Sequence, residues 1–122
     1  MYSDCKEPTI VAKNGLFFNT ESYVYLDYGT QVIVPPFEDS DGPTLKGFTR
    51  LLFSLYEYNL GIPAAHLHDY MCRHKEEYDR KISTQMLVDL WVRAGLPKWK
   101  GALVGFGVNL YQLLQNGSEW KS

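Results

Sequence analysis

The spacing of the apolar residues changes once along this chain, at the pair Pro35-Pro36. Before this pair, apolar and polar residues alternate in the manner of β-strands. After it, apolar residues recur every three to four positions, as on one face of a helix. A single change of this kind predicts strands first and helices second. With 122 residues, of which 45% are hydrophobic, the chain is expected to form one α+β domain spanning residues 1–122.

Turn signals divide the strand region, residues 9–35. Asn14-Gly15 and Gly29 each separate two short apolar runs. Asn and Gly tolerate the positive φ angles that tight hairpin turns need. The pattern therefore predicts a small N-terminal antiparallel β meander, preceded by a flexible tail over residues 1–8. Its strands are expected at residues 9–13, 16–18, 23–28 and 30–34.

An acidic loop over residues 36–44 leads into a helical layer over residues 45–115. Gly61 with Pro63, and Gly95 with Pro97, mark the boundaries between helices, because glycine favours helix ends and proline is tolerated in a first turn. About four helices are expected, at residues 45–58, from Pro63 to Cys72, at residues 82–94, and from Lys98 onward.

The last predicted helix combines an apolar face with three glycines. The face comprises Trp99, Ala102, Leu103, Phe106, Leu110 and Leu114. Gly101, Gly105 and Gly107 lower its helix propensity, so tight packing against a neighbour must compensate. We expect Trp91 and Trp99 in the core. Tyr23 and Tyr25, from the strands, are the better candidates for an interface.

Charge and composition narrow the classes of function. The net charge is −2 and the chain has no basic stripe, which disfavours nucleic-acid binding. No apolar run approaches the length of a transmembrane segment, and the start MYSDCKEP does not resemble a secretory signal. Cys5 and Cys72 form no disulfide framework and are expected to be free thiols, which suits a protein made in a reducing cytoplasm.

The segment AAHLHDYMC, residues 64–72, places His68 and Asp69 within an apolar helical run. Successive residues lie about 100° apart around a helix, so these side chains would reach one cavity without facing each other. The imidazole could act as a general base and the carboxylate as a metal or water ligand. Alternatively the pair is architectural, with His68 donating to a loop carbonyl and Asp69 bonding the acidic loop. His66 lies off the apolar stripe and is expected near the surface.

Asp41 belongs to the loop EDSDG, residues 38–42. Closely spaced carboxylates before a glycine are typical of a turn and also of calcium sites. Asp41 and Asp69 are therefore candidate calcium ligands, although the spacing of an EF-hand is absent. His68 and Cys72 have the i,i+4 spacing of paired zinc ligands, but no second pair completes a four-ligand site, so zinc is not expected.

The His-Asp pair on a helix resembles the catalytic helix of secretory phospholipases. In those enzymes the His activates water and the Asp holds calcium. The cysteines that flank their pair, and their Gly-rich calcium loop, have no counterpart in this sequence. The resemblance implies a metal-assisted hydrolase with His68 as base, Asp69 as metal ligand or water-positioning group, and Asp41 as helper.

The order of features over residues 23 to 111 also resembles a domain of unknown function found in tailed phages and prophages. The matching positions are Val34, Pro35, Ser40, Asp41, Thr44, His68, Asp69, Tyr70, Arg80 and Gly95. The chain departs from the family pattern at Phe37, Lys46, Cys72 and Thr84. Thr84 stands where the family has Asp, so a carboxylate that orients the imidazole would have to come from Asp79 or Asp41.

This second resemblance implies a non-catalytic phage or prophage protein with a structural or interaction role, attached to a virion or tail. His68, Asp69, Asp41 and Thr44 would then pin the acidic loop onto the helices, with Thr44 and Tyr70 as further binding candidates. Two alternatives stay open: a hydrolase acting on lipid or cell-envelope substrates, and a host-takeover or anti-defence protein. In each case synthesis in the bacterial host cytoplasm is expected. A protein partner is also expected, and an oligomer is left open.

Overall fold

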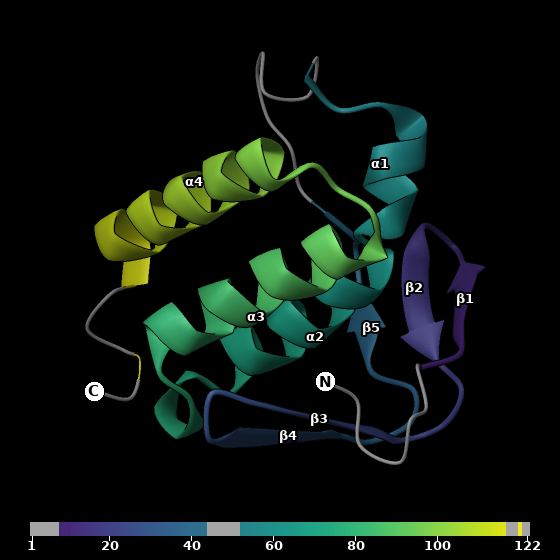
Figure 1. Ribbon diagram of the computed structural model, residues 1–122. Helices are drawn as coiled ribbons and strands as arrows, with labels where there is room; N and C mark the ends of the chain where they lie inside the picture. Colours follow the sequence, from purple (N-terminus) through teal and green to yellow (C-terminus); the bar gives the residue numbers. More distant parts are fainter. Residues whose placement is uncertain (1–7, 44–51, 117–119, 121–122) are drawn as a thin grey trace.

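Strands precede helices along the chain, and the α+β class with an antiparallel N-terminal part is confirmed (Figure 1). The computed structural model describes residues 8–43, 52–116 and 120. The strands are β1 (Ile10–Lys13), β2 (Leu16–Asn19), β3 (Tyr23–Asp27), β4 (Thr30–Val34) and β5 (Asp39–Ser40). They form two sheets: the three-stranded β1-β2-β5 and the two-stranded β3-β4. The two predicted hairpins therefore belong to different sheets.

The expected turns close both hairpins. Asn14 and Gly15 have φ angles of 55° and 79°, and Tyr28 and Gly29 have φ angles of 50° and 68°. Two successive positive φ angles are the backbone of the turns that match the twist of antiparallel strands. The tyrosine at position 28 adopts this unusual conformation in a turn where its hydroxyl bonds Asp89 of the helical layer. That contact joins the tip of β3-β4 to the helices.

The β3-β4 pairing places Tyr23 opposite Val34 and Tyr25 opposite Val32. All four side chains are buried in the core, whereas Leu26 and Ile33 lie on the outer, exposed face. The expectation that Tyr23 and Tyr25 form an external interface is therefore wrong. Side chains alternate between the faces of a strand, so the tyrosines share the valines' face and pack against the helices.

The helices are α1 (Leu55–Leu60), α2 (Ile62–Arg73), the short 3-10 helix η3 (Lys75–Glu77), α3 (Arg80–Ala94) and α4 (Lys98–Asn116). In the part of the chain that the structure describes, none of them is long and apolar enough to cross a membrane. The predicted helix over 45–58 is confirmed from Leu55 onward but is wrong over residues 52–54, because α1 starts only at Leu55; residues 45–51 lie outside the described part of the chain. Ser54 and Glu57 form a capping box, which begins a helix.

Trp91 occupies the centre of the core, as predicted, and is 2% exposed. Its Nε1 donates a hydrogen bond of 2.8 Å to the backbone oxygen of Glu57. A Cβ atom built on Gly61 would lie 2.4 Å from Trp91 Cε2, so only glycine fits at that point. The residue that separates α1 from α2 is thus also the residue that lets α3 approach them.

The expected tight packing of α4 is present at two of its glycines. A Cβ atom on Gly101 would lie 2.7 Å from Val92 Cγ2, and one on Gly105 would lie 3.2 Å from Val88 Cγ2. These glycines bring α4 against α3, on the side of α3 away from the β3-β4 hairpin (Figure 1). The apolar face that includes Trp99 points the other way. Trp99 is 58% exposed, so its predicted core position is wrong.

Candidate functional site

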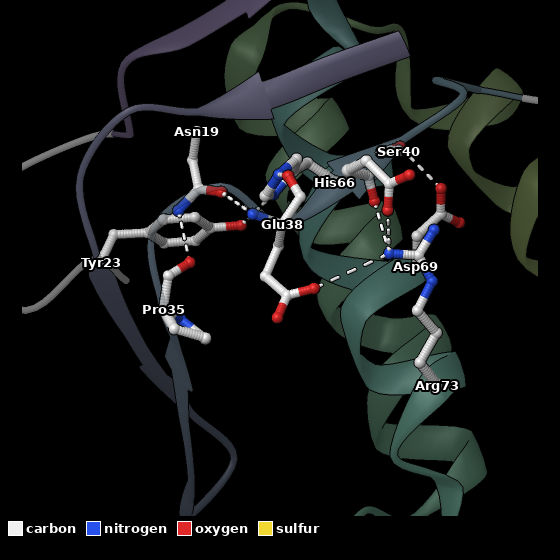
Figure 2. Close-up of polar contacts among 9 residues, drawn as sticks. Asn19, Tyr23, Pro35, Glu38, Ser40, His66, Asp69 and Arg73 are labelled. Atoms are coloured by element: carbon white, nitrogen blue, oxygen red, sulfur yellow. Dashed lines mark hydrogen bonds and ion pairs between the residues drawn. The ribbon is translucent and has the colours of Figure 1, made fainter.

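Helix α2 presents polar side chains on two neighbouring sides. His66, Asp69 and Arg73 follow the spacing i, i+3, i+7, and all three contact the loop after β4 (Figure 2). His68 and Cys72 lie further around the helix and line a cavity, and Asp69 also reaches that cavity. Asp69 therefore stands at the boundary between a loop-binding side and a cavity side.

His66 is 1% exposed, so its expected surface position is wrong. Its Nε2 lies 2.8 Å from the backbone oxygen of Glu38, and its Nδ1 lies 2.6 Å from the hydroxyl of Tyr23. Because a carbonyl oxygen only accepts, Nε2 carries the proton and the Tyr23 hydroxyl donates to Nδ1. Burial lowers the pKa of His66, which keeps the ring neutral. The ring therefore links β3, the loop and α2 as a satisfied core group.

Asn19 fixes the start of the same loop and was not singled out by the sequence. It is fully buried, and its Nδ2 donates to the backbone oxygens of Glu21 and Pro35, each at 2.8 Å. Its Oδ1 accepts the N–H of Glu38 at 2.9 Å. One side chain thus satisfies three backbone groups where the chain leaves the sheet. Figure 2 shows two of these contacts, to Pro35 and Glu38.

Asp69 binds the acidic loop through a hydroxyl rather than through backbone N–H groups. Ser40 Oγ donates to Asp69 Oδ2 at 2.6 Å, and the N–H of Gly42 donates to Ser40 Oγ at 3.0 Å. Burial raises the pKa of Asp69 to about 6. The hydrogen bond from Ser40 opposes that rise, and the neighbouring Asp41 adds to it. Ser40 therefore stabilises the turn at Gly42 and anchors the loop on α2.

Arg73 neutralises the loop further along α2. Its Nη1 donates to the backbone oxygen and to Oδ1 of Asp39, both at 2.7 Å, and lies 3.8 Å from Glu38 Oε2. Asp41 is exposed beside Asp69. Over the described ranges 8–43 and 52–116 and at residue 120, no three His, Cys, Asp or Glu side chains are grouped so that they could hold a metal ion. Glu38 and Asp39 are the loop carboxylates that are engaged with α2, through Arg73.

His68 belongs to a chain of polar groups that joins three helices. Gln112 Nε2, on α4, donates to His68 Nε2 at 3.3 Å, so the proton of the ring sits on Nδ1, which lies 3.6 Å from Cys72 Sγ. Gln112 Oε1 in turn accepts from the hydroxyl of Thr84, on α3, at 3.3 Å. Thr84 therefore reaches the imidazole of His68 indirectly, through the amide of Gln112.

Burial keeps the side chains of His68 and Cys72 in their neutral forms. Burial lowers the pKa of His68 to about 4 and raises the pKa of Cys72 to about 12. A general base works best with a pKa near the working pH, and a nucleophilic cysteine needs a lowered pKa. Asp79, one of the two carboxylates that could have oriented the ring, instead caps α3 by accepting the N–H of Ile82. The arrangement is suited to holding a neutral molecule or to packing.

The cavity has a volume of about 520 Å³ and lies between α2, α3, α4 and residues near the loop. His68 and Asp69 both line it, so the predicted shared cavity is present. Cys72 and Gln112 lie beside them, and most of the remaining wall is apolar or aromatic. Its larger apolar residues include Phe53, Leu87, Trp91, Val108, Tyr111 and Trp120.

Tyr70, another candidate residue, is not among the residues that line the cavity. The Tyr70 ring is half-buried, with its centroid 4.3 Å from that of His74, and burial raises its pKa. Thr44 lies outside the described residues, so its expected binding role stays a prediction.

A second surface feature lies on α4, on the side facing away from the core. We call this side the free face of α4. Its large apolar side chains are exposed, including Phe106 at 70% and Leu114 at 76%, and the set comprises Trp99, Leu103, Phe106, Leu110, Tyr111 and Leu114. With 100° per residue, this face is centred nearly opposite the glycine face that contacts α3. Beside it runs a groove of about 840 Å³ between α3 and α4. The basic residues lining this groove are Arg80, Lys81, Arg93 and Lys98, and the acidic one is Asp89.

Comparison of the chain with protein-family models, curated proteins and solved structures gave no match. The resemblances to the phage domain and to the phospholipase helix therefore stay predictions.

Proposed function

We propose that this protein is a non-catalytic interaction protein that binds a protein partner through the free face of α4. The observation that carries the proposal is the exposure of this face: Trp99, Leu103, Phe106, Leu110, Tyr111 and Leu114 are all between 44% and 76% exposed. Single exposed hydrophobic residues are common on proteins, but a continuous stripe along a five-turn helix marks an interaction surface. Its aromatic residues, Trp99, Phe106 and Tyr111, are of the kind that typically anchor protein interfaces.

The charge beside this face indicates the chemistry of the partner. Four basic side chains and one acidic side chain line the groove that borders Phe106. Asp89 is bonded to Tyr28 and Gln85, and Arg93 is paired with Asp27, so Arg80, Lys81 and Lys98 carry the groove's excess of positive charge. A partner helix with an apolar stripe and an acidic flank would complement both surfaces. We therefore assign the surface to an acidic amphipathic segment of another protein.

The hydrolase alternative has weaker support. With a pKa of about 4, His68 is a poor general base near neutral pH, and its ring contacts an amide and a thiol rather than a carboxylate. The residues meant to support it, Asp69 and Asp41, lie at the loop contact with Ser40. The geometry favours the architectural interpretation for Asp69, which accepts from Ser40 of the loop, whereas His68 contacts Gln112 and Cys72 instead of the expected loop carbonyl.

The phage or prophage setting rests on the sequence resemblance alone. In that setting the partner is a virion or tail protein for a structural role. A bacterial protein would be the partner for the host-takeover or anti-defence alternative. Both versions use the same surface of α4, and they differ in the identity of the protein that is bound.

Site-specific photo-crosslinking tests the proposal. A photoreactive residue is placed at Phe106, or at exposed Lys13 on β1 as control, and the protein is produced in bacteria during phage growth. We expect one discrete adduct with a protein from position 106, absent from position 13, and its mass spectrum to identify a virion or host protein with an acidic helix. Equal labelling at both positions would contradict the proposal.

Substitutions distinguish specific binding at this surface from nonspecific hydrophobic association. Phe106→Ser with Leu114→Ser should abolish the adduct, formed through a crosslinker at Leu110, without changing the thermal midpoint. Ile33→Ser, which removes an exposed apolar residue from the β3-β4 sheet, should leave it intact. Turnover of lipid or peptidoglycan that is lost in His68→Gln would instead support the hydrolase.

A further inference from the structure

The cavity between α2, α3 and α4 contains a buried hydrogen-bond donor that plays no part in the proposed docking on the free face. It is lined by Trp120, whose side chain is 6% exposed and whose Nε1 is buried without a hydrogen-bond partner among the described residues. The other buried indole, Trp91, donates to a backbone oxygen. A buried N–H without an acceptor costs free energy, so an acceptor supplied from the cavity would be favourable.

The rest of the wall indicates what would carry that acceptor. A volume of about 520 Å³ falls within the range of about 300–1,000 Å³ typical of small-molecule pockets. Phe53, Trp91 and Tyr111 offer aromatic surface, and Leu87 and Val108 offer aliphatic surface. The wall is thus mainly apolar with a few polar groups, which is the usual composition of such pockets.

The polar groups of the wall disfavour a charged ligand. His68 and Cys72 are held in their neutral forms, and the pKa of Asp69 is raised by burial. Lys75 and Asp69 bring opposite charges to the wall, so neither sign of ligand charge gains a consistent partner. An ion entering this site would lose hydration without adequate compensation.

We propose that this cavity binds an uncharged, mainly apolar small molecule that bears a carbonyl or similar acceptor, which receives the hydrogen bond of Trp120 Nε1. The ligand would lie between α2, α3 and α4, in contact with the core face of α4. Leu103 and Tyr111 belong both to the cavity wall and to the free face, so the two sites are adjacent but separate in their other residues.

The probe for the test is 6-propionyl-2-dimethylaminonaphthalene, an uncharged fluorophore whose ketone accepts hydrogen bonds. Titration with the full chain should give saturable binding and a blue shift of emission. A naphthalene sulfonate of similar size should bind at least tenfold more weakly. If the sulfonate binds as well as the ketone, the proposed ligand class is wrong.

Gly107→Leu locates the binding site. Gly107 lines the cavity, and a Cβ atom there would meet no atom within 4 Å, so the added side chain takes up ligand space without displacing a neighbour. We expect at least tenfold weaker binding of the ketone. Ala102→Leu adds the same side chain to the same helix away from the cavity and should bind normally. Unchanged binding in Gly107→Leu would overturn the proposal.

Trp120→Phe tests the hydrogen bond. It should weaken the ketone about tenfold, and should weaken 2-dimethylaminonaphthalene, which lacks the ketone, much less. The indole N–H signal of Trp120 in an ¹⁵N-correlated spectrum of the wild type should also move on binding, while that of exposed Trp99 stays in place. This spectrum decides the matter even if the variant fails to fold: movement of the Trp99 signal alone would refute the proposal.

Discussion

Ser40 Oγ donates a hydrogen bond of 2.6 Å to Asp69 Oδ2, and the carboxyl that accepts it lines the same cavity as His68. Burial acts on the two neighbours in opposite directions, raising the pKa of Asp69 to about 6 and lowering the pKa of His68 to about 4. Each therefore makes stability depend on pH, and the two dependences partly cancel between pH 4 and pH 6.

Asp69→Asn should remove the pH dependence of stability that Asp69 causes. The folded-state pKa of Asp69 lies above its ordinary value of 3.8, so the ionised carboxyl costs stability increasingly as pH rises from about 4 to about 6. Asn keeps an acceptor for Ser40 and removes that cost. We expect the variant to exceed the wild type near pH 7 by up to about 3 kcal/mol, and to match it near pH 4. Urea unfolding at several pH values measures this, and a difference independent of pH would contradict it.

For His68→Gln, the stability difference from the wild type should change with pH in the opposite direction. The folded-state pKa of about 4 lies below the ordinary 6.5, so His68 contributes stability above pH 6.5 that is lost as pH falls toward 4. Gln offers an acceptor to Gln112 but does not titrate. Relative to the wild type, the variant should gain up to about 3 kcal/mol on going from pH 7 to pH 4. The same unfolding series applies, and slopes of equal sign in the two variants would refute this account of the pair.

Gly61→Ala should be strongly destabilising. The new Cβ atom would lie 2.4 Å from the indole of Trp91, and crowding of this kind in a well-packed core costs about 1–3 kcal/mol. Gly107→Ala is the matched control, because its Cβ meets nothing within 4 Å and alanine favours helices by up to about 1 kcal/mol. Thermal melts should therefore move in opposite directions for the two variants. A stabilised Gly61→Ala would show that Trp91 can shift.

Tyr23→Phe should reveal how much the buried His66 contact contributes. Without the hydroxyl, His66 Nδ1 is left buried without its donor, at a cost of about 1–3 kcal/mol. Tyr111→Phe removes a hydroxyl from an exposed tyrosine and should change stability by less than about 0.5 kcal/mol. Chemical unfolding at pH 7 compares the two. Equal effects would mean that water replaces the Tyr23 hydroxyl as the donor to His66 Nδ1.

Local signals predicted much of the fold. Asn14-Gly15 and Gly95 impose their backbone conformation through residues adjacent in sequence, with φ angles of 55°, 79° and 133°, so a turn and a helix end were readable. The 100° offset of His68 and Asp69 placed both at one cavity for the same reason.

The remaining features depend on partners distant in sequence. His66 is buried because Tyr23, 43 residues earlier, and a backbone oxygen at Glu38 satisfy it, and a backbone acceptor leaves no trace in side-chain identity. Helix α4 has two apolar faces, and periodicity alone does not tell which one packs. Gly101 and Gly105 allow the closest approach to α3, so the face with smaller residues is the buried one.

The free face of α4 also affects how much of the protein can remain in solution. Six large apolar side chains held in water make each unbound copy prone to self-association as its concentration rises, while a bound copy is protected. Under the proposed function, the amount of protein that stays in solution in a cell is tied to the amount of its partner. Production in excess of that partner should end in precipitation, and co-production should restore a stoichiometric, soluble yield.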